Sequence, residues 1–122
     1  MKLHLMQDPG LQLFSGYGAG FVVVNNVRYE TCLVVSPQAV IEWGVSGFEA
    51  LTAADFGFIE SLKPEIMILG TGATQRFPRP ELTRGLAAAG VGVEVMDSPA
   101  ACRTYNILAT EGRKVVAAIL TA

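Results

Sequence analysis

The chain has 122 residues, 51% of them hydrophobic and only 16% charged, and its formal net charge is −2. This length suffices for one compact core, so we expect residues 1–122 to fold as a single domain. The weak negative charge and the scattered Lys and Arg residues argue against nucleic-acid binding, and no apolar run approaches the roughly 20 residues of a membrane-spanning helix. The N-terminus lacks the apolar segment of a signal peptide, so a cytoplasmic location is expected.

The first part of the chain is expected to be rich in β-strands. Residues 21–24 and 27–29 are β-branched or aromatic for the most part, and the pair Asn25-Asn26 between them tolerates the positive φ angles of a hairpin turn. The glycine-rich run before them, residues 16–20, is predicted to be a flexible turn, because glycine readily adopts positive φ. This segment therefore predicts one antiparallel hairpin.

A second antiparallel pair is predicted between residues 31 and 43. Residues 31–36 are another β-branched run, and Pro37-Gln38 suits a turn before residues 39–43. Trp43 closes the second strand of this pair. It is expected in the core or at an interface.

From residue 50 the pattern changes to helices that alternate with strands. A first helix is predicted from Thr52, which resembles a capping-box start with Asp55 three positions later, to Pro64. A second helix is predicted over residues 80–89, with Gly90 as its stop. Its buried stripe is expected at Leu82, Leu86 and Ala89.

A third helix is predicted to open with Ser98 as its N-cap and Pro99 in its first turn, and to end near residues 111–112. Short apolar runs that indicate covered strands lie at residues 66–69 and 115–120, and the alternation of Val91, Val93 and Val95 predicts another strand between them. Hairpins followed by alternating helices and strands predict an α/β sandwich with three helices and some mixed strand pairing.

Residues 66–77, IMILGTGATQRF, begin like a nucleotide-binding loop but do not complete the pattern. A dinucleotide fingerprint needs G-x-G-x-x-G directly before a helix, whereas Gln75 holds the third glycine position and residues 77–80 delay the helix. The G-K-[ST] of a Walker loop is also missing. We therefore predict that residues 66–69 form a strand covered on both faces and that residues 70–72 form a tight turn after it. We expect no cofactor.

A ligand hypothesis remains for the end of the sheet. In open α/β sheets, ligands bind outside the carboxyl ends of the strands. If the strands at 66–69 and 91–96 are parallel, loops 70–79 and 97–103 meet at that end. The candidate residues for binding a small molecule or anion are Thr71, Gln75, Arg76, Asp97, Ser98 and Arg103.

Arg103 is the most informative of these residues, because a cation near a helix N-terminus opposes the helix dipole. We expect Asp97, a backbone carbonyl or a bound anion to hold it. The alternative is a structural salt bridge or a solvated side chain. Whether Arg76 and Arg103 share one cleft separates these possibilities.

The cysteines and the histidine restrict the possible chemistry. His4 is the only histidine, which excludes a His-based triad, or a metal site with two histidines, within one chain. Cys32 and Cys102 lack the paired spacing of a zinc or redox site, so buried reduced thiols are expected. Cys102 lies near a helix N-terminus and an arginine, a setting that activates thiols, but its apolar neighbours favour a packing role. No metal site and no catalytic residues are predicted.

Several segments together resemble a known family of small domains. The most specific part is R-T-Y-N, residues 103–106, followed by E-G-R, residues 111–113. The family contains mitochondrial complex I assembly factor 3 and many uncharacterised bacterial and archaeal proteins, and the resemblance runs from about residue 14 to 120. The other segments that carry it are 16–18 with 20–21, Trp43, 66–72 with 76–77, 94–97 and 100–102.

The resemblance implies a three-layer fold around a mixed five-stranded sheet, with the final strand inserted centrally and antiparallel to its neighbours. It supplies no catalytic residues, and the mitochondrial members act as assembly factors through protein contacts. Because the chain lacks a transit peptide, a bacterial or archaeal origin is expected.

Three functional hypotheses follow. The first is a non-enzymatic module that binds a protein partner, as an assembly factor does, with homodimerisation as a further possibility. The second is the small-molecule or anion site at loops 70–79 and 97–103. The third is a hydrolase or transferase that uses Cys102 as its nucleophile. Enzymatic activity is left open, and the sequence favours the first hypothesis.

Overall fold

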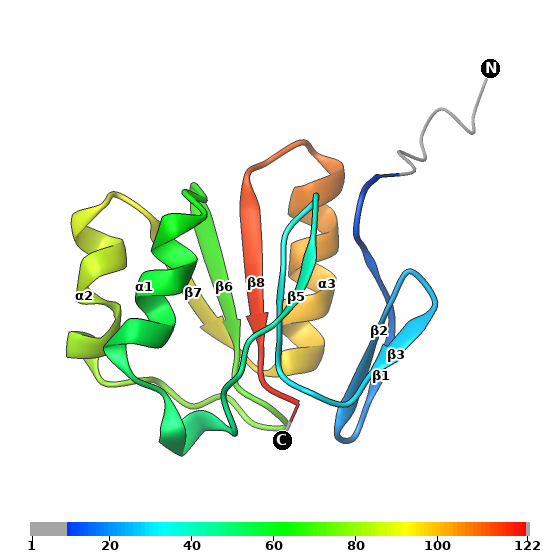
Figure 1. Cartoon of the computed structure of the whole chain (residues 1–122). Helices are drawn as coiled ribbons and strands as arrows, with labels where there is room; N and C mark the ends of the chain where they lie inside the picture. The colour runs from blue at the N-terminus through cyan, green and yellow to red at the C-terminus, as the bar shows by residue number, and fades with distance from the viewer. Residues whose placement is uncertain (1–9, 122) are drawn as a thin grey trace.

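Eight strands form two sheets in the computed structural model, which describes residues 10–121 (Figure 1). The larger sheet has five strands in the order β5 (Val40–Glu42), β4 (Leu33–Val35), β8 (Val115–Ile119), β6 (Ile66–Gly70) and β7 (Gly92–Met96). The smaller, antiparallel sheet contains β1 (Phe14–Gly18), β2 (Phe21–Val24) and β3 (Val27–Tyr29). The mixed five-stranded sheet is therefore confirmed. His4 lies outside the described residues.

The final strand, β8, occupies the centre of the larger sheet, but its direction was only half predicted. It pairs antiparallel with β4 and parallel with β6. The expectation that β8 runs antiparallel to both neighbours is wrong. The physical reason is the crossover through helix α3 (Ser98–Thr110), which carries the chain from β7 back along the sheet, so that β8 starts at the same end as β6 and β7.

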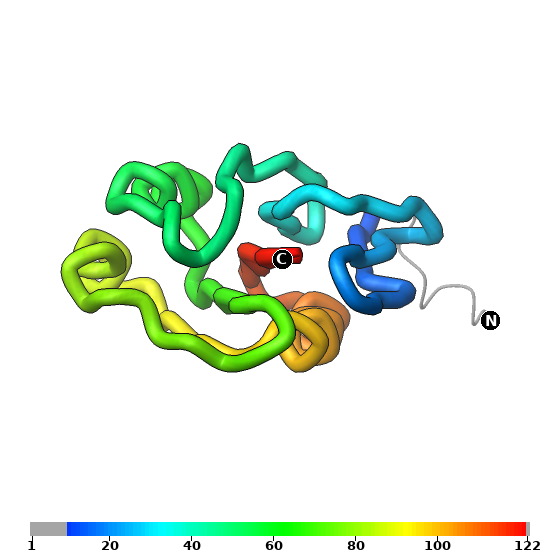
Figure 2. The backbone as a smooth tube through the Cα atoms, turned by 90° about the horizontal axis from the view of Figure 1, so that it is seen from below, coloured from blue at the N-terminus to red at the C-terminus, as the bar shows by residue number. Residues whose placement is uncertain are grey.

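Strand alternation divides the core into two halves. On β8, Val115, Ala117 and Ile119 face one cluster, and Val116 and Ala118 face the other. Helix α3 and the small sheet cover the first face, while helices α1 (Ala53–Ser61) and α2 (Pro80–Ala88) cover the second (Figure 2). The result is a three-layer arrangement. All five residues of β8 are buried, which explains its continuous apolar sequence.

Local signals in the sequence fix several element ends. Asn25 and Asn26 have φ angles of 48° and 69° and form the β2–β3 turn, as predicted. Thr52 and Asp55 form a reciprocal capping box at the start of α1. Gly90, with a φ of 80°, follows α2 and ends it as expected.

Three local expectations need correction. The glycine-rich run at 16–20 is not one turn, because residues 16–18 belong to β1 and pair with β2. Ala89 is exposed, since α2 has already ended at that position, and Leu86 is the fully buried residue of the stripe. The N-cap of α3 is Asp97 rather than Ser98, because the Asp97 carboxylate accepts the Ala100 amide and leaves the Ser98 hydroxyl free for another contact.

Candidate functional site

The carboxyl ends of β6 and β7 lie next to each other, as the ligand hypothesis required. The two strands run parallel, and Gly70 is opposite Met96. The loop that follows β6 crosses this end of the sheet before it reaches α2 (Figure 2). Thr71, Gln75, Asp97 and Ser98 are therefore brought to one end of the sheet, as predicted.

Thr71 is fully buried and uses its polar groups within the loop. Its hydroxyl donates to the Thr74 carbonyl at 2.7 Å and accepts the Arg76 amide at 3.0 Å. Its own amide donates to the Met96 carbonyl at 3.0 Å. Thr71 thus holds loop 71–76 in a fixed turn against β7, and its oxygen is already occupied.

Ser98 fastens the same loop to the end of β8. Its hydroxyl accepts the Gly72 amide at 2.8 Å and donates to the Leu120 carbonyl at 2.7 Å, and its amide donates to the Gly72 carbonyl at 2.8 Å. Gly70 is required beside it, because a Cβ atom at Gly70 would stand 2.9 Å from the Ser98 hydroxyl oxygen and 3.0 Å from the Ala101 Cβ. Ser98 is therefore a buried structural link between two strand ends and a helix.

Gln75 and Asp97 also bond to the backbone. The Gln75 side-chain amide donates to the Val95 carbonyl at 2.8 Å. The Asp97 carboxylate accepts the Ala100 amide at 2.8 Å and caps α3. Each of these side chains stabilises the local backbone.

The two candidate arginines contact different parts of the molecule. Arg76 donates to the Thr71 carbonyl at 3.0 Å, and its guanidinium carbon lies 4.5 Å from the centre of the Phe48 ring. Arg103 donates to the Tyr17 hydroxyl at 2.7 Å. Arg103 is thus held by a tyrosine of β1, a partner that the sequence did not indicate. The small-molecule or anion site stays a prediction, and the contacts of Arg76 and Arg103 do not support it.

Cys102 has the environment of a packing residue. Its side chain is 1% exposed in the core beneath α3. Burial raises the pKa of the thiol to about 12, against a smaller opposing effect of the Arg103 charge. Because the thiolate is the nucleophile, this pKa is far from what a catalytic cysteine needs near neutral pH.

The R-T-Y-N segment attaches α3 to the small sheet, a role that the sequence analysis missed. The Asn106 side chain accepts the Phe14 amide at 2.9 Å and donates to the Phe14 carbonyl at 2.7 Å. The Tyr105 hydroxyl donates to the Gln12 carbonyl at 2.8 Å, and its ring packs edge-on against Phe14 at 5.3 Å. With Arg103 bonded to Tyr17, three of the four residues of this motif hold residues 12–17 against α3. The sequence did contain one indication of this contact, a run of polar residues on a helix whose inner face is apolar.

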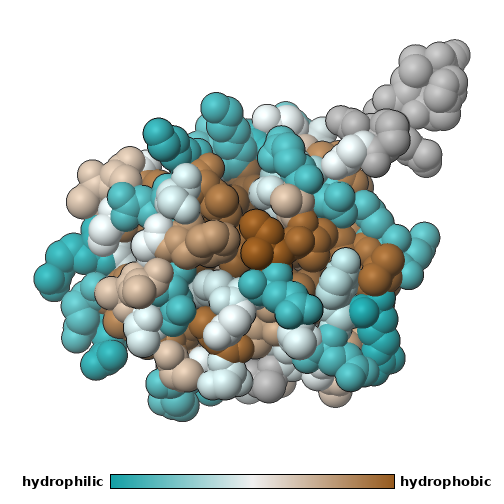
Figure 3. Space-filling model, in the orientation of Figure 1, coloured by the Kyte–Doolittle hydropathy of each residue, from teal (hydrophilic) through white to brown (hydrophobic). Residues whose placement is uncertain are grey.

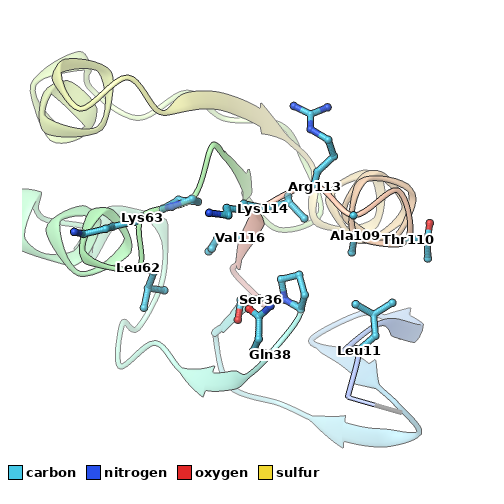
Figure 4. A pocket seen from close by; sticks show the side chains of 14 residues that line it. Leu11, Ser36, Gln38, Leu62, Lys63, Ala109, Thr110, Arg113, Lys114 and Val116 are labelled. Carbon is cyan, nitrogen blue, oxygen red and sulfur yellow. The ribbon is translucent and has the colours of Figure 1, made fainter. Parts of the chain in front are cut away.

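A groove of about 950 Å³ lies at the opposite end of the sheet, where β6 and β8 begin. In Figure 4, Leu62 and Lys63 stand on one side of it and Leu11, Ala109 and Thr110 on the other, while Arg113 points away. The other residues that line it are Ser36, Pro37, Gln38, Pro64, Gly112, Lys114, Val115 and Val116. Among residues 10–121, its lining combines apolar, neutral and basic side chains and contains no carboxylate.

The basic side chains at the groove differ in whether they form an ion pair. Arg113 forms an exposed ion pair with Glu65, which lowers the pKa of that carboxyl. Within residues 10–121, the ammonium groups of Lys63 and Lys114 form no ion pair and no hydrogen bond. Lys63 also has a φ of 55°, a left-handed conformation usually reserved for glycine after a helix. The groove thus presents two ammonium groups without a direct partner among the described residues, and the charge of Lys114 also helps to lower the pKa of Glu65.

Two further properties concern the described part of the chain only. No three His, Cys, Asp or Glu residues between positions 10 and 121 are grouped so that they could hold a metal ion. None of the helices there has both the length and the apolar character needed to cross a bilayer.

Comparisons with known proteins agree with the resemblance seen in the sequence. The family described as "Protein of unknown function (DUF498/DUF598)" matches residues 14–120. The bovine protein named NADH dehydrogenase (ubiquinone) 1 alpha subcomplex assembly factor 3 is 37% identical over 124 residues, which cover 98% of this chain and 67% of the relative. The chain therefore spans about two thirds of that protein's length.

Two bacterial proteins match along nearly their whole length. The 13 kDa major membrane protein of Francisella tularensis is 32% identical over 120 residues, or 94% of this chain and 98% of the relative. A crystal structure of a Bordetella parapertussis protein superposes with a TM-score of 0.86 at 42% identity, covering 91% of this chain and 96% of that one. These matches confirm the resemblance and the three-layer α/β fold.

Proposed function

This chain belongs to the DUF498/DUF598 family, and we propose that it acts as a non-enzymatic, assembly-factor-like module that binds a protein partner. The observation that carries the proposal is the similarity to the bovine assembly factor, which extends over 98% of this chain. Because the chain spans about two thirds of that relative, the identity of the partner and of any complex assembled is itself part of the proposal. A cytoplasmic location also stays a prediction.

The use of the polar residues supports a binding role over a catalytic one. Thr71, Gln75, Asp97 and Ser98 bond to backbone groups of their own chain, and the Cys102 thiol is buried with a raised pKa. Residues that hold the fold in this way are poorly placed to act on a substrate. A protein contact needs an accessible surface instead.

We assign the partner contact to the groove where β6 and β8 begin. It offers an apolar lining, the hydroxyl and amide groups of Ser36 and Gln38, and the ammonium groups of Lys63 and Lys114. Figure 3 shows apolar surface gathered across the middle of one face, with hydrophilic side chains around it. Charge complementarity then favours a partner segment that carries carboxylates beside apolar side chains.

A charge-reversal experiment tests this proposal. The tagged chain, the double variant Lys63→Glu/Lys114→Glu and the control variant Arg84→Glu are each purified from the native host, and co-purifying proteins are quantified by mass spectrometry. Arg84 is an exposed α2 residue away from the groove, so Arg84→Glu controls for a charge reversal elsewhere on the surface. We expect at least one protein to co-purify in stoichiometric amount with the wild type and the control, and to be lost from the double variant.

The opposite results are also informative. If no protein co-purifies with any form above the tag-only background, the binding role is contradicted. If a partner is retained by the double variant, the chain is a binding module but the groove is the wrong surface.

A further inference from the structure

An exposed phenylalanine stands next to a small hollow at the carboxyl end of the sheet. Phe77 is 71% exposed, more than any other large hydrophobic side chain in residues 10–121. The hollow beside it has a volume of about 400 Å³. Its lining is Phe48, Glu49, Leu51, Phe77, Pro78, Arg79 and Leu82. A protruding aromatic side chain thus borders a mostly apolar depression.

The loop that presents Phe77 is held rigidly. Thr71 accepts the Arg76 amide, Gln75 is bonded to β7, and the Arg76 guanidinium lies over the ring of Phe48 in the hollow's wall. A loop fixed in this way loses little conformational entropy when it binds. The aromatic side chain and the hollow therefore keep a constant relative position, which a specific contact requires.

The charges beside the hollow have both signs. Glu49 is exposed and makes no ion pair or hydrogen bond within the described residues, while Arg79 pairs only loosely with Glu81, at 4.0 Å. A surface that carries one carboxylate and one guanidinium matches itself across a two-fold axis, because each group meets its opposite on the other copy. The same relation would place each Phe77 over the other copy's hollow.

We propose that this face mediates homodimerisation, with Phe77 of each protomer inserted into the partner's hollow and Glu49 paired with Arg79 across the interface. Aromatic side chains inserted into desolvated pockets carry most of the energy of such contacts. The face lies at the carboxyl end of the parallel strands, whereas the groove assigned to the protein partner lies at their amino end. The two contacts are therefore separate, and this inference does not rest on the proposed function.

The first experiment measures the oligomeric state of the purified full chain. Sedimentation equilibrium from about 1 mM to about 1 µM covers the usual range of weak homodimers. We expect a concentration-dependent dimer for the wild type, and a dissociation constant at least about tenfold higher for Phe77→Glu. The control Ile107→Glu, at another strongly exposed position on α3, is expected to dimerise like the wild type. Because Phe77 and Ile107 are both exposed, neither substitution should prevent folding, which circular dichroism checks.

The second experiment tests the reciprocal pairing. Glu49→Arg alone places two arginines together at each contact, and Arg79→Glu alone places two carboxylates together, so each variant should be monomeric. A mixture of the two variants restores opposite charges at both contacts and should form a heterodimer. This recovery cannot arise from a general effect on stability.

Clear results would overturn the inference. A wild-type chain that is monomeric over the whole concentration range excludes self-association. A dimer that survives Phe77→Glu, or that is lost with Ile107→Glu, uses another face. Failure of the mixed variants to associate contradicts the two-fold arrangement of Glu49 and Arg79.

Discussion

The two ends of the five-stranded sheet differ in how their polar groups are used. At the carboxyl ends of β6 and β7, the side chains of Thr71, Gln75 and Ser98 are committed to backbone groups. At the amino ends, Lys63 and Lys114 line a groove of about 950 Å³ and form no ion pair with any residue that the structure describes. In the sequence, the carboxyl end resembles a binding site. In the structure, its polar side chains hold the loops against the sheet. Charged groups on an accessible surface that lack an ion pair are the better guide to where a partner binds.

Loss of the Ser98 hydroxyl should show the structural role of the carboxyl end most strongly. Ser98→Ala leaves the Gly72 amide and the Leu120 carbonyl without their partner. Because each buried unsatisfied group costs about 1–3 kcal/mol, we expect the free energy of unfolding to fall by about 2–4 kcal/mol. Urea denaturation measures this. Thr74→Ala in the same loop, where only the backbone carbonyl is bonded, should change stability by less than about 0.5 kcal/mol.

Two glycine substitutions compare a crowded position with an open one. Gly70→Ala places a methyl group within 3.0 Å of Ser98 and Ala101, and overpacking of this kind costs about 2 kcal/mol. Gly57→Ala in α1 meets no atom within 4 Å and should stabilise the fold by about 0.5–1 kcal/mol, because alanine favours the helix. Thermal unfolding of both variants shows whether Gly70→Ala lowers stability and Gly57→Ala raises it. Equal effects would contradict the close approach of α3 to the end of β6.

The buried thiol predicts a pH dependence. The pKa of Cys102 is raised to about 12 in the folded state, so the unfolded chain releases its proton first as the pH rises. Stability should therefore be full below about pH 8.5 and fall by about 1 kcal/mol between pH 9 and pH 10. That window lies below the ordinary pKa of tyrosine, which limits interference from Tyr105. Denaturation of the wild type and of Cys102→Ala should show this fall in the wild type alone, and parallel pH profiles would refute it.

At the amino end, a substitution should raise stability. Lys63 adopts a left-handed conformation at the C-terminus of α1, and glycine adopts it without strain. Lys63→Gly should increase the free energy of unfolding by about 0.5–1 kcal/mol, whereas Lys63→Ala removes the same charge without this gain. Partner binding should weaken in both variants. A Lys63→Gly variant that is less stable than the wild type would show that the lysine has a structural role.

Much of the fold was predictable because its signals are local. The Asn25-Asn26 turn, the Thr52–Asp55 capping box and the glycine after α2 each depend on neighbouring residues only. The direction of β8 relative to β6 depends on a long crossover, and the continuous apolar sequence of β8 does not encode it. The sequence did not indicate that residues 16–18 belong to a strand, because a glycine-rich run is typical of a flexible turn and carries no sign of the pairing with β2.

The candidate site was predictable in position but not in role. The ligand hypothesis depended on parallel pairing of β6 and β7, and this pairing brings Thr71 and Ser98 to one end of the sheet in the structure. Whether a hydroxyl is free depends on which backbone groups reach it, and for Ser98 these come from residues 26 and 22 positions away. For Asn106 the bonded backbone, at Phe14, is 92 positions away. The sequence also could not show the groove, because four separated segments build it.

The most direct test places a photo-crosslinking amino acid at each end of the sheet in the native host. Position 38 lies in the groove, and position 74 lies in the fastened loop at the carboxyl end. We expect irradiation to join the position-38 variant to one discrete protein other than itself. We expect the position-74 variant to join, at most, to a second copy of this chain. A foreign protein captured at position 74 and not at position 38 would show that the partner binds at the carboxyl end of the sheet and not in the groove.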